Sequence, residues 1–470
     1  MQLFTAFFII ILTTGVFAQS GRTATPESTP KTAAATERSV KELFDEASSY
    51  TRVKFSEYAD KNLPFSERLQ EQTRREQKQL AAKNAAIATK RGGFAGDDLY
   101  FLGMLHWIAD NLDGTAESLT SYVSSPGAAA DKVQTARYLL AIAAAKQARF
   151  DDAEKSLTDY LANQPVKLIE RLRIESELAK GYQSARRFDR MAPHAEQAYA
   201  AAKSSAKEAG TRVRALDEML DTGMLVFEAY SGIGNIEKAD LALDELRTTA
   251  KLAESPSFYY YAADKKITYM IDTGRKAAAM AYYVESLVLS TKDFAAKTAQ
   301  TDVYNRLKRR EAHYKLLGEP APEFAPADQW LPGKPRTLAE LRGKVVFIDF
   351  WAIWCGPCIE AFPSIRQWQQ EYGKEGLEIL GVTRYYGMQV GAKDPVAEIG
   401  ILKGFRTKHS LNYDFVVAKD QSIQLQYGAV ALPTAVLIDR KGVIRYVATG
   451  TNSTRLEEIR AMIAKLIAEK

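Results

Sequence analysis

The chain has 470 residues and a formal net charge of +5, from 63 basic and 58 acidic side chains spread along its length. This length exceeds what one hydrophobic core usually supports, so two or more domains are expected. Nearly balanced charge and 46% hydrophobic residues are typical of an ordinary globular protein, and they give no reason to propose a nucleic-acid or anionic-membrane partner.

The N-terminus predicts export. An unbroken apolar run covers residues 7–12, and Val16-Phe17-Ala18 then supplies the small residue that a signal peptidase reads. We therefore expect a signal peptide over residues 1–18 and a periplasmic or otherwise exported protein. Because no Lys or Arg precedes the apolar run, the alternative is an uncleaved segment that anchors the chain to a membrane. Residues 19–38 are rich in Thr, Ser, Ala and Pro and are expected to form a disordered linker.

Residues 39–317 show helical periodicity throughout, with a unit that repeats. The sequence at 118–123 returns 38 residues later at 156–161, and Arg149-Phe150-Asp151 returns at 187–189 with the same offset. Further turns between helices are expected at residues 234–236 and 274–275. The pattern predicts an all-α array of helical hairpins.

Residues 147–153 resemble the turn and second-helix start of tetratricopeptide repeats. The spacing of roughly 38 to 48 residues exceeds the usual ~34, so elongated repeats are expected. The resemblance implies stacked hairpins whose extended surface binds a peptide or protein partner. The alternative is a helical scaffold that only supports the rest of the chain, because fold alone does not assign function.

A composition break follows at residues 318–326, where closely spaced prolines end the helical pattern. Beyond it, strand-like and helical runs alternate, which predicts an α/β domain with a mixed central sheet over residues 318–470. We expect strands at 345–350 and 377–383, a helix at 394–409, a closing hairpin of strands at 434–439 and 443–449, and a terminal helix at 455–468.

The two cysteines of the chain, Cys355 and Cys358, lie three apart after an apolar strand and open a helix. Such a pair is typical of a redox-active dithiol. At the helix N-terminus the Cys355 thiolate would be stabilised and would attack a substrate disulfide, after which Cys358 would release the product. The alternative is half of a zinc site, which needs two more ligands. The remaining candidates are isolated histidines, expected to be ordinary surface or partly buried residues: His106, His194, His313 and His409.

Four motifs occur in order in the last third of the chain. They are Gly318-x-Pro320-Ala321-Pro322-x-Phe324, Leu341-Arg342-Gly343-Lys344-Val345-Val346, Trp354-Cys355-Gly356-Pro357-Cys358 and Leu432-Pro433-Thr434. With these motifs, residues 318–470 resemble the thioredoxin superfamily, and within it the exported TlpA/ResA-type thiol–disulfide oxidoreductases.

The resemblance implies an enzyme that acts on protein thiols and disulfides with no bound cofactor or metal. A membrane thiol–disulfide relay would supply electrons, and reduction of apocytochrome c before haem attachment is a family role. The Gly-Pro dipeptide between the cysteines is shared with thioredoxins and suggests a reductase. The resemblance also makes Pro433 a cis-proline and implies these substrate-binding residues: Trp354, Gly356, Pro357, Leu432 and Pro433.

Asp349 lies six residues before Cys355 within an apolar strand, where a buried carboxyl should have a raised pKa and could take the proton of Cys358. Thioredoxins carry Asp at this place. ResA-type relatives often carry Glu three residues after the second cysteine, but here Ala361 stands there and Glu360 precedes it. We therefore expect Asp349 to act in proton transfer; the alternative is a buried acid that is merely hydrogen-bonded.

Two other functions stay open. A thiol peroxidase would share this core, but peroxiredoxins place Thr three residues before the reactive cysteine, where this chain has Ala352. The third possibility is an adaptor in which the helical repeats bind partners and the redox domain serves as a docking module.

Overall fold

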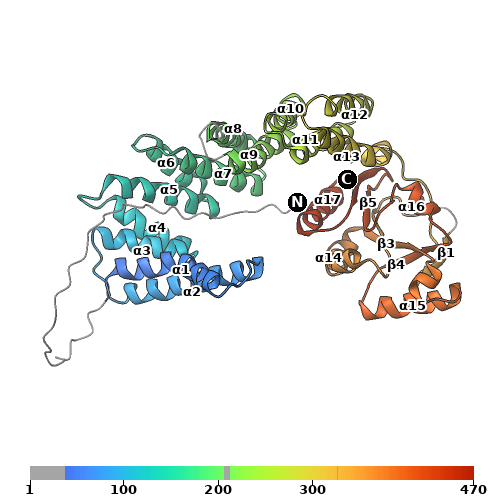
Figure 1. Ribbon diagram of the computed structural model, residues 1–470, viewed down its shortest axis with the longest axis horizontal. Coiled ribbons are helices and arrows are strands. Elements are labelled where there is room, and N and C mark those ends of the chain that lie inside the picture. Colours follow the sequence, from blue (N-terminus) through green and yellow to red (C-terminus); the bar gives the residue numbers. More distant parts are fainter. Residues whose placement is uncertain (1–37, 206–211, 325–326, 470) are drawn as a thin grey trace. The chain divides into compact units, whose positions relative to one another are not determined.

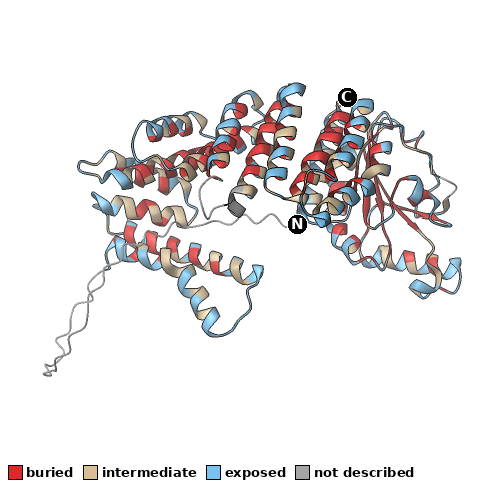
Figure 2. Cartoon of the chain, turned by 45° about the horizontal axis from the view of Figure 1, so that its top comes forward, coloured by how far each residue is buried: buried red, intermediate tan, exposed pale blue. Residues whose placement is uncertain are grey.

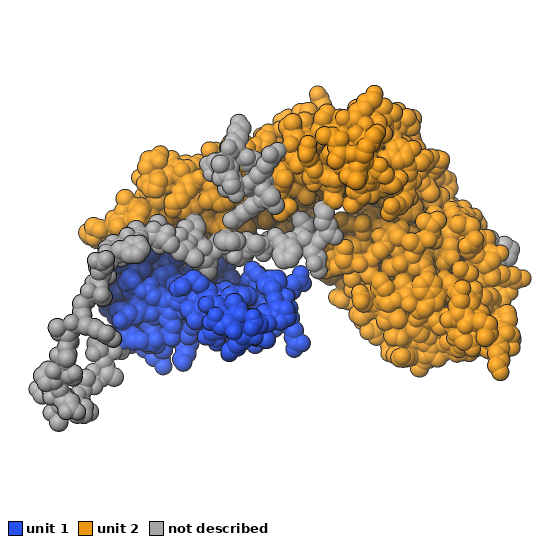
Figure 3. Space-filling view, viewed as in Figure 1, with its two compact units in different colours: residues 1–114 blue, residues 115–470 orange. Residues whose placement is uncertain are grey.

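The computed structural model describes residues 38–205, 212–324 and 327–469. The predicted signal peptide and all but the last residue of the predicted linker lie outside these ranges. Among the described helices, none combines the length and apolar character needed to cross a membrane. The chain divides into two compact units, residues 1–114 and 115–470 (Figure 3). The domain boundaries expected from composition, at residues 39 and 318, stay predictions.

The first unit is built from helices α1 (Val40–Asp60), α2 (Glu67–Thr89) and α3 (Asp97–Ile108). A capping box starts α1, because the Ser39 side chain accepts from the Glu42 N–H while the Glu42 carboxylate binds the Ser39 N–H. Two buried amides of α2 donate to carbonyls of α1 at 2.9 Å, and small residues let the two helices approach closely. The core of this unit comprises Val40, Leu43, Ala47, Ala81, Ala85, Ala88, Leu102 and Leu105.

The second unit is helical up to residue 316, as predicted, and from α5 to α13 each helix packs with the next one in sequence (Figure 1). Their buried faces are rich in Ala and Tyr, and Figure 2 shows buried residues on the facing sides of the helices. The helices are α4 (Leu112–Val123), α5 (Ala130–Lys146), α6 (Phe150–Leu161), α7 (Leu168–Ser184), α8 (Phe188–Ser205), α9 (Arg212–Ile233), α10 (Ile236–Leu252), α11 (Pro256–Asp272), α12 (Lys276–Ser290) and α13 (Lys297–Leu316).

The same turn joins the two helices of successive hairpins. In each, a residue with positive φ follows the first helix, and the next N–H donates back to a carbonyl five residues earlier, the pattern of a Schellman C-cap. The turns predicted at 234–236 and 274–275 are confirmed. The donating N–H groups belong to Asn111, Arg149, Arg187, Asn235 and Arg275. Recurrence of this backbone turn explains the repeated sequence around Arg149 and Arg187.

The last third of the chain forms a six-stranded mixed sheet in the order β1-β4-β3-β2-β5-β6. Strands β2, β3 and β4 run parallel, while β1, β5 and β6 are antiparallel to their neighbours. The predicted fold class is therefore confirmed. The strands are β1 (Ala327–Leu331), β2 (Val345–Phe350), β3 (Leu377–Arg384), β4 (Asp414–Ala418), β5 (Thr434–Ile438) and β6 (Ile444–Thr449).

Helices α14 (Gly356–Tyr372), α15 (Pro395–Lys408) and α17 (Ser453–Ala468) share one apolar cluster with a face of the sheet. Two short 3-10 turns, η1 (Gly373–Glu375) and η2 (Gly387–Val390), and the short helix α16 (Ser422–Gln426) complete the domain. The predicted elements lie within two residues of those observed. The sequence expectations missed β1, which is a partly polar edge strand, and β4, which is a buried strand of five residues.

Candidate active site

The two cysteines lie where β2 passes into α14. Every residue of β2 is buried, and Cys355 is the N-cap of α14, with its Sγ accepting from the Cys358 N–H at 3.3 Å. Gly356 and Pro357 occupy the first turn, where proline is tolerated because the first N–H groups of a helix have no intrahelical partner. The local sequence therefore places a sulfur atom at the positive end of the helix dipole.

Cys355 and Cys358 are joined by a disulfide, with a Cα–Cα distance of 5.3 Å. Cys358 is fully buried, whereas Cys355 keeps 4% exposure and is followed by the exposed residues Gly356 and Pro357. Of the two sulfur atoms, that of Cys355 therefore lies nearer to solvent. The first attack expected for Cys355 and the resolving step expected for Cys358 stay predictions.

An aromatic pair lies beside the disulfide. The Trp354 side chain is 55% exposed, and the ring of Tyr386 meets it edge-on with centroids 5.5 Å apart. The guanidinium of Arg384 lies 4.4 Å from the centroid of Tyr386. The buried carboxylate of Glu398 accepts from the N–H groups of Tyr386 and Gly387, at 2.8 and 2.9 Å. A charged acceptor in the core thus holds the loop that carries Tyr386.

Asp349 faces the same side of the sheet as the cysteine helix. Alternation in β2 gives it the orientation of Val345 and Phe347, and both of these belong to the apolar cluster that contains Cys358. Burial raises the pKa of Asp349 to about 7. Within the described structure, its Oδ2 atom has no hydrogen-bond partner. The expectation of a buried carboxyl with a raised pKa is therefore confirmed, while its role in proton transfer stays a prediction.

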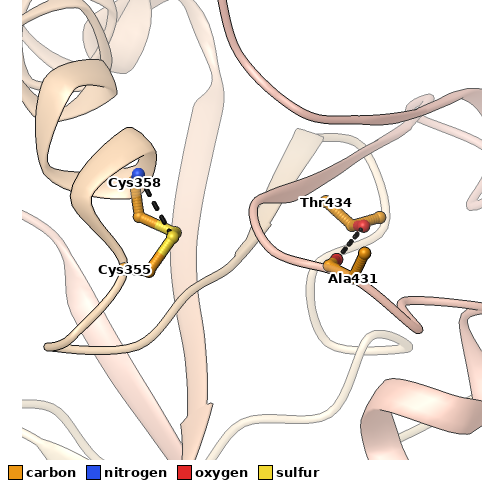
Figure 4. The surroundings of a disulfide bond; sticks show 4 residues. All are labelled: Cys355, Cys358, Ala431 and Thr434. Carbon is orange, nitrogen blue, oxygen red and sulfur yellow. Dashed lines mark hydrogen bonds between the residues drawn. A yellow bond between two sulfur atoms is a disulfide. The ribbon is translucent and has the colours of Figure 1, made fainter.

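The Leu432–Pro433 peptide is cis, as the resemblance implied. Leu432 packs against the cluster that holds both cysteines, and Figure 4 shows the turn from Ala431 to Thr434 across from the disulfide. The turn is held from both sides, because Thr434 Oγ1 donates to the Ala431 carbonyl at 2.7 Å and Gly450 N–H donates to the Pro433 carbonyl at 2.8 Å.

A Redoxin family model matches residues 316–463. The thiol–disulfide oxidoreductase ResA of Geobacillus thermodenitrificans is 33% identical over 135 residues, which are 29% of this chain and 70% of that protein. ResA of Geobacillus kaustophilus matches with the same identity and the same shares. This chain belongs to the ResA family of thiol–disulfide oxidoreductases.

A solved structure of a thiol:disulfide interchange protein of the thioredoxin family from Chlorobium tepidum is 22% identical, with a TM-score of 0.26, over 32% of this chain and 96% of that one. The ResA matches confirm the predicted enzyme class. They cover less than a third of the chain, so the helical array carries no family assignment from them.

In this ResA-family domain, the structure brings Cys355, Cys358 and Trp354 together at the start of α14. Ala361 is buried in the cluster, while Glu360 is exposed, so the acidic side chain that follows Cys358 most closely points to solvent. In the described part of the chain, no three His, Cys, Asp or Glu side chains gather as a metal site. The substrate-binding roles expected for Trp354 and the proline turn stay predictions.

Sequence reasoning missed several residues around the site. Tyr386, Glu398 and Tyr413 come from segments that carried no motif, and only the chain crossing from β3 to β4 brings them near the cysteine helix. His313, expected to be an ordinary surface or partly buried residue, is instead buried against the sheet domain. A buried Glu within a helix and a lone His in a basic segment give no sequence signal, because such residues are usually solvated.

Proposed function

We propose that this chain is an exported reductase of protein disulfides that works through Cys355 and Cys358. The observation that carries the proposal is the cysteine pair at the N-terminus of α14, in which Cys358 is fully buried and Cys355 keeps 4% exposure. The exposed ring of Trp354 and the cis-Pro433 turn lie beside it and are proposed to contact the substrate chain, with the backbone of Gly356, Pro357 and Leu432.

In the first step, the Cys355 thiolate attacks one sulfur of a substrate disulfide and forms a mixed disulfide, while the other substrate sulfur leaves as a thiolate. The thiolate is favoured by the helix N-terminus and by the Cys358 N–H, which donates to its sulfur. The 4% exposure of Cys355, against none for Cys358, supports this order of attack.

In the second step, Cys358 gives its proton to the Asp349 carboxylate and attacks Cys355 Sγ. The second substrate sulfur leaves as a thiolate, and the two substrate thiolates take up one proton from Asp349 and one from water. The two electrons that the substrate gains come from the Cys355–Cys358 dithiol, which becomes the disulfide present in this structure. A carboxyl whose pKa is raised to about 7 exchanges protons readily near neutral pH. No further cofactor is required by this exchange.

The oxidised pair must then be reduced. We propose a membrane thiol–disulfide relay as the electron donor, since the signal peptide expected at residues 1–18 would place the domain in the periplasm or another exported compartment. Apocytochrome c is a candidate client, because haem attachment requires reduced cysteines.

The helical array is proposed to select client proteins. Exposed apolar side chains on α10 and α12, among them Leu241 and Val284, support such a surface. Clients captured by the full chain should change when Leu241 and Val284 are both replaced by Lys. An unchanged set of captured proteins would leave the array with a scaffold role.

Capture with Cys358→Ser tests the central proposal. This variant cannot resolve the mixed disulfide, so client proteins should accumulate on Cys355, while Cys355→Ser should capture none. Peroxide consumption with a thiol donor, without capture, would favour the thiol peroxidase alternative. A Cys355→Ser, Cys358→Ser double variant that keeps full function in cells would favour the adaptor.

A further inference from the structure

The last helix of the array carries a buried histidine that touches the sheet domain. His313 of α13 is 3% exposed, and its Nε2 atom lies 2.9 Å from the carbonyl oxygen of Gly428. Gly428 opens the segment that leads through Val430 and Leu432 to Pro433. One side chain of the repeats therefore contacts the same loop that carries the cis-proline.

The neighbours of His313 determine its proton position. Arg310 Nη1 lies 2.8 Å from His313 Nδ1. A guanidinium can only donate, so Nδ1 must be the acceptor, and the single imidazole proton is on Nε2. Nε2–H therefore donates to Gly428. Burial, followed by the charge of Arg310, lowers the pKa of His313 to about 4, which keeps the ring neutral near pH 7.

Arg310 is itself fixed by groups from both sides of this junction. Its Nε donates to Asp264 Oδ1 on α11 at 3.0 Å, and its Nη1 donates to the Val447 carbonyl of β6 at 2.8 Å. The Tyr314 hydroxyl donates to the same Asp264 oxygen at 2.6 Å. His313 and Tyr314 are buried and Arg310 and Asp264 are partly buried, and these hydrogen bonds together hold the imidazole in one orientation.

The loop is anchored at both ends. Gly428 has a φ of +65°, and a Cβ at this position would lie 3.0 Å from His313 Cδ2, so the loop and the ring are in close contact. At the other end, Gly450 N–H donates to the Pro433 carbonyl at 2.8 Å. Val430, between these anchors, is 77% exposed. His313 is the anchor at the start of this exposed stretch.

We propose that His313 is a positioning residue of the oxidoreductase, through which the last repeat helix holds residues 428–433 in their substrate-binding conformation. The inference rests on the proposed function, in which Leu432 and Pro433 meet the substrate opposite Cys355. It gives the array a role in the reaction itself, in addition to any choice of clients.

The same junction contains contacts that do not reach the loop, and they supply a control. Asp272 of α11 accepts from Arg445 of β6 at 2.7 Å and from Lys465 of α17 at 2.8 Å. Removing Lys465 weakens the attachment of array and sheet domain at this second place. A merely structural role for the junction would make loss of Lys465 and loss of His313 equivalent.

The test compares His313→Asn with His313→Gln in the full chain. The Gln amide can reach the position of Nε2 and donate to Gly428, whereas the Asn amide ends near Nδ1 and cannot. Each protein is assayed for reduction of insulin disulfides over a range of insulin concentrations, with dithiothreitol added to reduce the Cys355–Cys358 disulfide after each turnover. Alkylation of Cys355 by iodoacetamide reports the reactivity of the thiolate, and this small reagent does not need residues 428–433 to bind.

Asn should raise the KM for insulin about three- to tenfold, the effect of one lost hydrogen bond, with the alkylation rate within twofold of wild type. Gln and Lys465→Ala should stay close to wild type in both assays. Should His313→Asn fail to fold, Gly428→Ala disrupts the same contact from the loop side, and it should raise the KM for insulin in the same way.

Equal KM values for wild type, Asn and Gln would overturn the inference, as would an equal loss in insulin reduction and alkylation. A wild-type chain that does not reduce insulin overturns the proposed function and the inference together. An active wild type with unaffected His313 and Gly428 variants overturns the inference alone.

Discussion

Asp349 in β2 lies directly beside Gly381 in β3, as paired residues of two parallel strands. Because glycine has no side chain, rings occupy the space next to it: an added Cβ would lie 2.9 Å from Trp351 Nε1 and 3.1 Å from Tyr413 Cε2. Trp351 Nε1, Tyr413 OH and Asp349 Oδ2 are all buried, and none of the three has a hydrogen-bond partner among the described residues. Asp349 is therefore a carboxyl whose raised pKa comes from burial alone.

Replacing Asp349 by Asn should stabilise the protein at alkaline pH and slow its turnover. The folded-state pKa of about 7 exceeds the unfolded value near 4, so the native state binds the proton more tightly, and stability falls as pH rises through this window. Asn cannot ionise, so the variant avoids this loss in unfolding free energy. The loss reaches up to about 4 kcal/mol at pH 8 and is absent near pH 3.

Urea unfolding of wild type and Asp349→Asn at pH 4 and pH 8 measures this difference. Turnover with insulin should fall in the variant, because Cys358 loses its proton acceptor, while alkylation of Cys355 should change little. If the gain in unfolding free energy of Asp349→Asn over wild type is no larger at pH 8 than at pH 4, the pKa of Asp349 is not raised by burial.

Tyr413→Phe should be neutral or stabilising by about 1 kcal/mol, since it removes a buried hydroxyl that makes no hydrogen bond. Tyr160→Phe is the matched comparison. Its hydroxyl donates to Glu170 at 2.8 Å and accepts from the Lys167 N–H at 2.9 Å, so its loss should cost about 1–3 kcal/mol. Thermal unfolding of both variants measures the two changes in stability. A large loss of stability for Tyr413→Phe would reveal a hydrogen-bond partner for that hydroxyl.

Glu398→Ala should release the loop beside the disulfide. It leaves the N–H groups of Tyr386 and Gly387 without their acceptor, and we expect a cost of about 2–4 kcal/mol together with a changed environment of Trp354. Chemical denaturation and tryptophan fluorescence measure the two effects. Glu360→Ala, at an exposed position, is the control and should alter neither.

Asp264→Ala should be among the most damaging changes outside the cysteine pair. Asp264 accepts from Arg310 at 3.0 Å and from Tyr314 at 2.6 Å, and its removal leaves a partly buried guanidinium without its countercharge. Breaking a fully buried pair costs about 3–5 kcal/mol, so this partly buried pair should cost about 2–3 kcal/mol. Unfolding of the full chain should show this loss, whereas Glu371→Ala, which breaks the exposed pair with Arg460, should cost under about 1 kcal/mol.

The ends of many helices and strands were predictable because local rules decide them. A nearly continuous apolar run predicted β2, and glycine turns marked the helical hairpins at Asn235 and Arg275. Strand β1 escaped prediction because an edge strand with polar residues has no periodic signature.

The sequence by itself determined the chemistry of this protein, since two cysteines three apart at a helix start, an Asp in an apolar strand and a Leu-Pro-Thr turn each carry a local signal. Only the tertiary structure decided that Gly381 leaves Asp349 among rings, that Glu398 holds Tyr386 beside Trp354, and that His313 reaches Gly428. These relationships join residues far apart in the chain, and they depend on burial and on hydrogen-bond partners that packing alone supplies.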